Sequence, residues 1–140
     1  MMSFWRTLAS ALALALLAAW PAAPGPAHAQ AAADAAPVRV EVVLSNFAFA
    51  PSDLRIPAGR PVALVLRNDG SGGHDFAAPE FFAAARVDPA DAAKLRRGRV
   101  EVPKGRTVTL RLVAAPGRYA LKCSHFLHAG FGMTGSITVD

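Results

Sequence analysis

The stretch from Cys123 to Met133 concentrates the side chains of this sequence that can bind a metal. It holds the only cysteine, two of the four histidines, His125 and His128, and one of the three methionines. A thiolate, imidazoles and a weak thioether suit a trigonal copper site with a long axial methionine, which requires one further histidine from elsewhere in the chain. His74 is available for this role on a separate segment.

Each of these residues also has an ordinary structural interpretation. Most lone cysteines are small buried hydrophobic residues, and a methionine near a strand often fills the core. A single cysteine cannot form an internal disulfide, and the spacing from Cys123 to His128 and Met133 favours ligands. His125 follows the cysteine by two residues and could compete with His128, but we expect it at the surface or hydrogen-bonded beside the site.

Short strands separated by turns must position these side chains. About seven such strands at regular spacing predict an all-β fold, a Greek-key β-sandwich. In such a sandwich, the strand ends that precede His74 and Cys123 can meet at one rim, and the turn-forming residues 67–73 lead directly to His74. The predicted strands are 38–44, 54–56, 61–66, 99–102, 107–113, 117–121 and 136–139.

The segment 79–97 is predicted to be a short helical insertion between strands. Residues 80–85 have a helical pattern, and residues 88–95 follow with Asp88 as N-cap and Pro89 at the first helical position. The pattern does not indicate what the insertion does.

The first 29 residues have the three parts of a secretory signal peptide. Arg6 is the only charge, an apolar run follows, and the segment ends at Ala29 after a Pro- and Ala-rich stretch. We expect cleavage after Ala29, a flexible N-terminal tail over 30–37, a copper-binding domain over 38–140, and a periplasmic location. The apolar run is too short for a bilayer-spanning helix of about 20 residues, so no membrane span is expected after cleavage.

The predicted mature chain is modestly basic. Loss of Arg6 lowers the formal net charge from +5 to +4, and many of the cations lie in 94–99 and 104–106. These runs lack the interleaved aromatic residues that stack bases, so we expect no nucleic-acid partner. We interpret them mainly as a solvated face, with docking to an acidic redox partner as the alternative.

The sequence resembles the cupredoxins, small exported proteins that hold a type 1 copper ion. The resemblance covers nearly the whole mature chain, and its most specific motif is the Cys-x4-His-x4-Met loop, longer than in the plastocyanin group and similar to that of rusticyanin. It implies that one copper ion is bound by His74, Cys123, His128 and Met133. The other matching segments are Phe47-Ala-Phe49-Ala-Pro51, Pro57-Ala-Gly59, Asn68 to Phe76 and Gly117-Arg-Tyr119.

Two features beside the ligands carry further expectations. Asp75 follows His74 where several cupredoxins have an asparagine, and we expect it either to accept a hydrogen bond from Ser124 or to be an ordinary turn aspartate. The apolar residues around His128, including Phe126 and Phe131, either form a hydrophobic docking patch or belong to the core.

The resemblance implies a periplasmic carrier of single electrons that cycles copper between Cu(II) and Cu(I) and is not an enzyme. Its partner would be a redox protein such as a cytochrome or a terminal reductase or oxidase. We expect a monomer, although no residue pattern specifies the oligomeric state. The alternative is a periplasmic protein of copper sequestration and tolerance that uses the same cysteine, two histidines and methionine; the intact ligand set argues against a copperless structural module.

Multicopper oxidases share the loop spacing and need separate consideration. They carry additional histidines immediately beside the cysteine, which bind a trinuclear copper cluster. Here Lys122 and Ser124 flank Cys123, and only three histidines remain after the predicted cleavage. This count excludes a complete oxidase.

Overall fold

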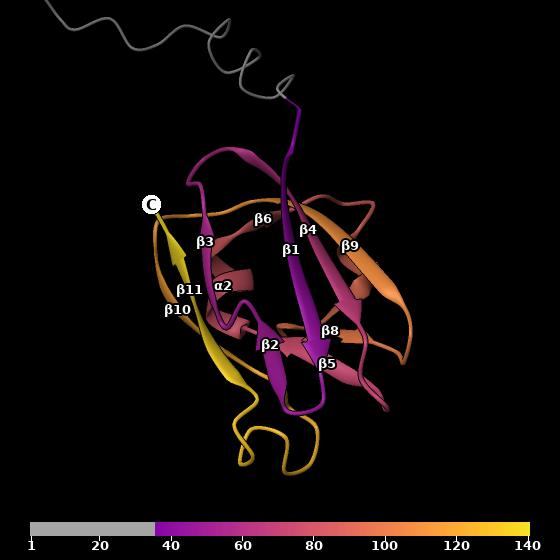
Figure 1. Ribbon diagram of the computed structural model, residues 1–140. Helices are drawn as coiled ribbons and strands as arrows, with labels where there is room; N and C mark the ends of the chain where they lie inside the picture. The colour runs from indigo at the N-terminus through magenta and orange to yellow at the C-terminus, as the bar shows by residue number, and fades with distance from the viewer. Residues whose placement is uncertain (1–35) are drawn as a thin grey trace, which may run out of the picture.

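The computed structural model describes residues 36–140, which form two β-sheets packed face to face (Figure 1). The predicted signal peptide and residues 30–35 of the predicted tail lie outside the described residues. The first sheet has the strand order β2-β1-β4-β9-β6 and the second the order β3-β11-β10-β5-β8-β7. The predicted all-β sandwich is therefore confirmed.

The strands of the first sheet are β1 (Val38–Ser45), β2 (Ala48–Ala50), β4 (Pro61–Asn68), β6 (Arg86–Val87) and β9 (Thr107–Val113). Those of the second sheet are β3 (Asp53–Ile56), β5 (His74–Ala77), β7 (Leu95–Arg96), β8 (Arg99–Val102), β10 (Gly117–Lys122) and β11 (Thr134–Val139). The β1–β4 and β3–β11 pairs are parallel and the other pairs are antiparallel.

The core lies between the two sheets and follows from the alternation of side chains along the strands. Leu64 and Leu66 of β4 are fully buried, as are Phe76 of β5 and Ile137 of β11. Burial of each such side chain contributes about 1.5–3 kcal/mol. Phe76 also makes edge-to-face contacts with two further aromatic rings, which belong to Phe49 and Phe82.

The predicted helical insertion is only partly helical. The first helix, α2 (Pro79–Ala84), buries Phe81 and Phe82 against the core. The second predicted helix, over residues 88–95, was wrong: after β6 the chain turns over residues 88–91, forms the 3-10 turn η1 (Ala92–Lys94) and enters β7 at Leu95.

Hydrogen bonds to β9 explain why the second helix does not form. The backbone N–H of Asp88 donates to the carbonyl of Arg111 at 2.8 Å. The buried carboxylate of Asp91 in turn accepts from the backbone N–H of Arg111 at 2.9 Å and from the Lys94 ammonium at 2.6 Å. These contacts with a distant strand override the local helical preference.

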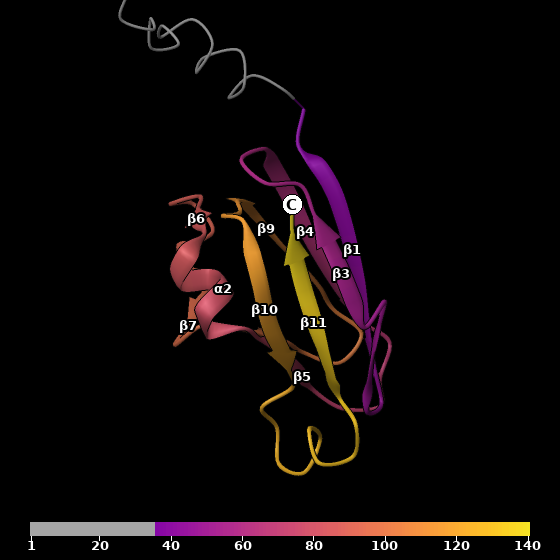
Figure 2. The same cartoon turned by 90° about the vertical axis from the view of Figure 1, so that its left-hand side faces the viewer.

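One end of the sandwich carries the loop between β10 and β11. Figure 2 shows this loop extending from the end opposite the C-terminus. The segment between β4 and β5 also reaches this end, because β4 finishes at Asn68 and β5 begins at His74. Within residues 36–140 we find no helix with the length and hydrophobicity that a bilayer span requires.

Candidate metal centre

Asn68 fixes the segment that delivers His74. Its side chain is buried and donates to the carbonyls of Gly72 at 2.9 Å and Val102 at 2.8 Å. Its Oδ1 accepts from the backbone N–H of Gly70 at 2.8 Å. An asparagine that bonds to the backbone two residues on is typical of a tight turn, and here it anchors the turn to β8.

The loop that follows β10 folds back on itself through backbone hydrogen bonds. The N–H of Cys123 donates to the carbonyl of Met133 at 3.0 Å, and the N–H of Met133 donates to the carbonyl of His128 at 3.0 Å. Leu127, at the tip, has a left-handed φ of 64°. The three predicted ligands of the loop are thereby drawn together, although they span eleven positions.

The structure brings His74, Cys123 and His128 into one cluster. His74 Nδ1 lies 3.2 Å from His128 Nδ1, Cys123 Sγ lies 3.4 Å from His128 Nδ1, and Cys123 Sγ lies 4.0 Å from His74 Nδ1. A triangle with these sides has a circumradius of about 2.1 Å, within the range of bonds from a first-row metal such as zinc to nitrogen and thiolate, about 2.0–2.3 Å. The group can therefore hold a metal ion.

Burial sets the protonation of the metal-free site. Desolvation raises the pKa of the Cys123 thiol. Desolvation, followed by repulsion from His128 and His125, lowers the pKa of His74, which favours the neutral imidazole needed in a ligand. A bound cation would replace the thiol proton, because the thiolate is the metal-binding form.

Met133 lies at the far end of the same loop and is fully buried. Its backbone bonds to both Cys123 and His128 place the start of β11 directly beside the cluster. The axial role of its thioether remains a prediction.

Asp75 connects the strand of His74 to the loop of Cys123. It is fully buried, and its carboxylate accepts from the backbone N–H of Ser124 at 2.6 Å and also from the Ser124 hydroxyl. Arg99 lies 3.6 Å from the same carboxylate and donates to Ser124 Oγ at 2.8 Å. The expected hydrogen bond between Asp75 and Ser124 is confirmed.

His125 bonds away from the cluster. Its Nε2 lies 2.9 Å from a carboxylate oxygen of Glu101 on β8, and its ring stacks beside His128 at a centroid distance of 5.5 Å. His125 therefore packs against the His128 ring and forms a hydrogen bond with Glu101. This is the position beside the site expected from the sequence.

Exposed apolar side chains surround His128. Phe126 and Phe131 are 86% and 65% exposed, so neither belongs to the core. Phe47, from the turn between β1 and β2, meets the ring of His128 edge-on at 5.2 Å and Phe131 at 5.4 Å. We call Phe47, Phe126, Leu127 and Phe131 the apolar patch.

Sequence reasoning missed three residues that contact the site: Phe47, Arg99 and Glu101. Phe47 lies in an alternating strand-like run, but it has a left-handed φ of 64° and its ring contacts those of His128 and Phe131. Arg99 and Glu101 reach the loop because β8 pairs with β5. No local pattern reports such pairing across the sheet.

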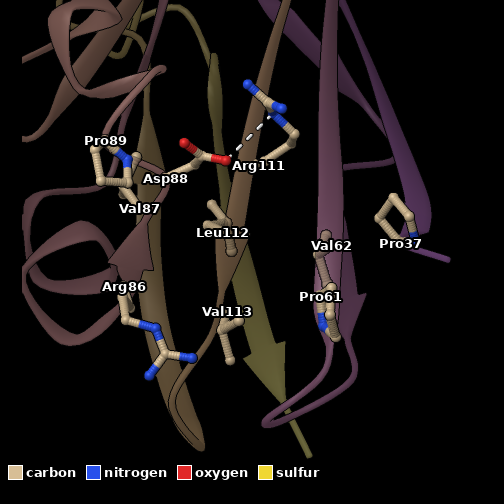
Figure 3. Close-up of a pocket in the computed structure, with 10 residues that line it drawn as sticks. All are labelled: Pro37, Pro61, Val62, Arg86, Val87, Asp88, Pro89, Arg111, Leu112 and Val113. Atoms are coloured by element: carbon tan, nitrogen blue, oxygen red, sulfur yellow. Dashed lines mark ion pairs between the residues drawn. The ribbon is translucent and has the colours of Figure 1, made fainter. Parts of the chain in front are cut away.

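A groove of about 380 Å³ lies at the other end of the sandwich (Figure 3). It is lined by the start of β4, the end of β9 and β6, and an ion pair between Asp88 and Arg111 crosses it at 3.6 Å. The register of Pro61 and Arg86, both opposite Val113, places it away from the cluster.

Comparisons with known proteins agree with this fold and site. The family model for the cupredoxin-like domain matches residues 8–139, so the chain belongs to the cupredoxin-like family. Its donor set and trigonal arrangement are those of a type 1 copper site, as the predicted cofactor requires. A search of curated proteins finds no significant match.

Solved structures of auracyanins are similar in fold. Dithionite-reduced auracyanin from Roseiflexus castenholzii superposes with a TM-score of 0.56 at 19% identity, over 76% of this chain and 99% of that one. Auracyanin B superposes with a TM-score of 0.56 at 22% identity, over 76% of this chain and 92% of its own. Auracyanin A from Chloroflexus aurantiacus, described as a blue copper protein, superposes with a TM-score of 0.53 at 22% identity, over 75% of this chain and 100% of its own.

Proposed function

We propose that this protein is a periplasmic carrier of single electrons, with one type 1 copper ion held by His74, Cys123 and His128 and an axial Met133. The observation that carries the proposal is the triangle of two imidazoles and one thiol, in which His74 and Cys123 are buried and His128 is half-buried. Membership of the cupredoxin-like family and the blue copper protein among the similar structures support it. When bound, copper supplies a one-electron Cu(II)/Cu(I) couple.

The residues around the triangle suit electron transfer better than substrate chemistry. Three protein donors with a fourth beside them leave no open coordination position, so we propose a carrier and not an enzyme. Hydrogen bonds fix both segments that carry the triangle. Asn68 bonds to Val102 and holds the turn before His74, and Asp75 bonds to Ser124 and holds the loop after Cys123. This support keeps the donors in place when the charge at the site changes.

The apolar patch provides the route by which electrons reach the site. His74 and Cys123 are buried, whereas His128 is half-buried and lies among Phe47, Phe126, Leu127 and Phe131. A partner that covers this patch would exclude water and bring its own centre close to the His128 ring.

Copper addition tests the site directly. The mature chain, from residue 30, should develop a strong visible thiolate-to-copper absorption with one equivalent of Cu(II), and Cys123→Ala should abolish it. His128→Ala should weaken or shift the band, whereas His125→Ala should retain it because His125 bonds to Glu101. A colourless protein, or a band that depends on His125 and not on His128, would contradict the ligand assignment.

Copper sequestration with the same ligands makes a different kinetic prediction. A carrier needs rapid electron exchange between its two states, whereas a storage protein needs only tight binding. Self-exchange of the copper-loaded protein, measured from line broadening in mixtures of reduced and oxidised protein, separates the two. Undetectable exchange, together with copper sensitivity of a deletion strain, would favour sequestration.

A further inference from the structure

The outer side of the second sheet carries a row of cations next to the metal centre. Lys122 of β10 pairs with Ala77 of β5, Ala77 pairs with Arg99 of β8, and Arg99 pairs with Arg96 of β7. Paired residues in neighbouring strands project to the same side of the sheet. The row therefore runs across four strands, and its first member immediately precedes Cys123.

These side chains point away from the core. Their strand neighbours Leu121 and Val100 are buried, whereas Lys122, Arg99 and Arg96 are exposed. Arg97, at the β7–β8 turn, is also exposed. We call Arg96, Arg97, Arg99 and Lys122 the cationic face.

Little negative charge on this side balances the cationic face. Among residues 36–140, Arg96, Arg97 and Lys122 form no ion pair. The two acids on β5, β7, β8 and β10 are already engaged: Asp75 by Ser124 and Arg99, and Glu101 by His125. The free cations thus attract an anion from outside the protein.

A shallow pocket lies within the cationic face. It has a volume of about 240 Å³ and is lined by Ala77, Arg97, Arg99, Lys122 and Ser124, among others. Ala77 is small and gives the pocket an apolar floor between two cations. A planar carboxylate fits such a place, because a guanidinium binds it through two parallel hydrogen bonds.

We propose that the cationic face docks an acidic surface of a redox partner protein, with a partner carboxylate seated between Arg97, Arg99 and Lys122. The proposal rests on the proposed function and adds the charge and position of the partner. Arg99 donates to Ser124 Oγ at 2.8 Å, and Ser124 is bonded to Cys123. A partner docked here is one hydrogen bond and one residue from the thiolate, separate from the route through His128.

Cytochrome c in its native and succinylated forms tests whether the partner surface must be acidic, because the two forms have the same haem and differ in surface charge. Succinylation converts basic lysines into carboxylates. The reaction transfers one electron between reduced copper protein and ferric haem, giving oxidised copper protein and ferrous haem, with no bond made or broken and no proton moved. The copper-loaded protein should exchange electrons faster with the succinylated form, and rising ionic strength should slow that reaction.

The test variant is the triple Arg96→Gln, Arg97→Gln, Lys122→Gln, which leaves Arg99 and its bond to Ser124 intact. The control triple Arg60→Gln, Arg86→Gln, Arg118→Gln removes the same charge from exposed positions at the opposite end of the strands. We expect the test variant to lose about tenfold in rate constant with succinylated cytochrome c at low salt, and the control less than about twofold. Reduction potentials of all three proteins are measured so that rates are compared at equal driving force.

Equal losses in both triple variants would overturn the proposal, because they would report net charge and not a docking place. Faster electron exchange with native than with succinylated cytochrome c would also overturn it. So would binding of the unmodified and control proteins to a DNA duplex at 0.15 M salt, if only the test variant fails to bind. The proposed function fails separately, by absence of the thiolate-to-copper band or of exchange with either cytochrome.

Discussion

The carboxylate of Asp75 accepts a hydrogen bond from the backbone N–H of Ser124 at 2.6 Å. This contact joins the residue after His74 to the residue after Cys123, so two predicted ligands, one at the start of β5 and one directly after β10, share one support. Asp75 is fully buried, and its nearest cation, Arg99, lies 3.6 Å away with a half-exposed side chain. A negative charge beside the site stabilises the more positive state of a bound ion.

Asp75→Asn should therefore raise the reduction potential of the copper-loaded protein. The amide keeps an oxygen for the Ser124 N–H but removes the charge, and we expect a rise on the order of 50 mV by voltammetry. Glu80→Gln is the control, because Glu80 is an exposed acid on α2 outside the site. An equal shift in both variants, or a fall for Asp75→Asn, would show that the buried charge does not set the potential.

Gly70 leaves room for the imidazole of His74. A Cβ added at Gly70 would lie 2.4 Å from His74 Nε2, closer than any real contact, whereas one added at Gly72 would meet nothing within 4 Å. Gly70→Ala must therefore displace either the ring or the turn. We expect copper affinity, measured by competition with a chelator, to fall on the order of tenfold in Gly70→Ala and to stay unchanged in Gly72→Ala.

Copper binding by Gly70→Ala checks whether the turn positions His74. His74 Nε2 is buried and has no hydrogen-bond partner within residues 36–140, so the ring is held by packing at that edge. If Gly70→Ala binds copper like the unmodified protein, the ring has moved without affecting the donor triangle, and the turn does not position His74.

The sequence was sufficient to predict the class of fold and the cluster of possible metal donors that the structure brings together. Cys123 and His128 share one short loop, and donor chemistry is a property of residue type, so both could be named as candidate ligands without coordinates. The strands were found because alternation is also local. Residues 88–95 behaved differently: Asp88 and Pro89 are good helix-starting residues, yet bonds to Arg111 decide the outcome.

Contacts that depend on strand pairing could not be predicted. Arg99 and Glu101 lie beside the loop only because β8 pairs with β5, and Lys122 joins Arg96 only through a register over four strands. The sequence shows the charges of residues 94–99 as a run. In the structure these charges differ in their contacts. Lys94 forms an ion pair with Asp91, whereas Arg96 and Arg97 form none within residues 36–140.

The most exposed residue of the apolar patch, Phe126, gives a test of electron self-exchange. Two copies that meet through their apolar patches must desolvate Phe126, which is 86% exposed. Phe126→Glu should slow self-exchange on the order of tenfold, because a carboxylate would be buried between two copies. Line broadening in mixtures of oxidised and reduced protein gives the rate.

Ala83→Glu is the matched control for this variant, since it adds the same charge at an exposed position on α2. Added negative charge lowers the repulsion between two positively charged copies, so the control should exchange at an equal or slightly higher rate. The visible spectra should be the same in all three proteins. A slower control, or an unaffected Phe126→Glu, would place the exchange contact elsewhere.

Asp91 ties η1 to β9 and should make folding stability depend on pH. Its side chain is 5% exposed, and hydrogen bonds from Lys94, then from Arg111, hold the pKa of its carboxyl well below the usual value. A carboxyl whose pKa is lower in the folded state stabilises fully above its unfolded pKa, near 3.8, and loses that contribution as the pH falls toward the folded value.

Asp91→Asn should therefore destabilise the protein at pH 7 by about 1–3 kcal/mol, because Lys94 and Arg111 lose a charged acceptor that is itself buried. Below about pH 4 the gap between the variant and the unmodified protein should narrow, since the native carboxyl is also being neutralised. Asp140→Asn is the control: it pairs with Arg55 at 3.3 Å but is 64% exposed, so its loss should change stability little. Urea unfolding at pH 7, 5 and 3 measures all three proteins, and a gap that widens toward pH 3 would contradict the assignment of Asp91 as a charged anchor.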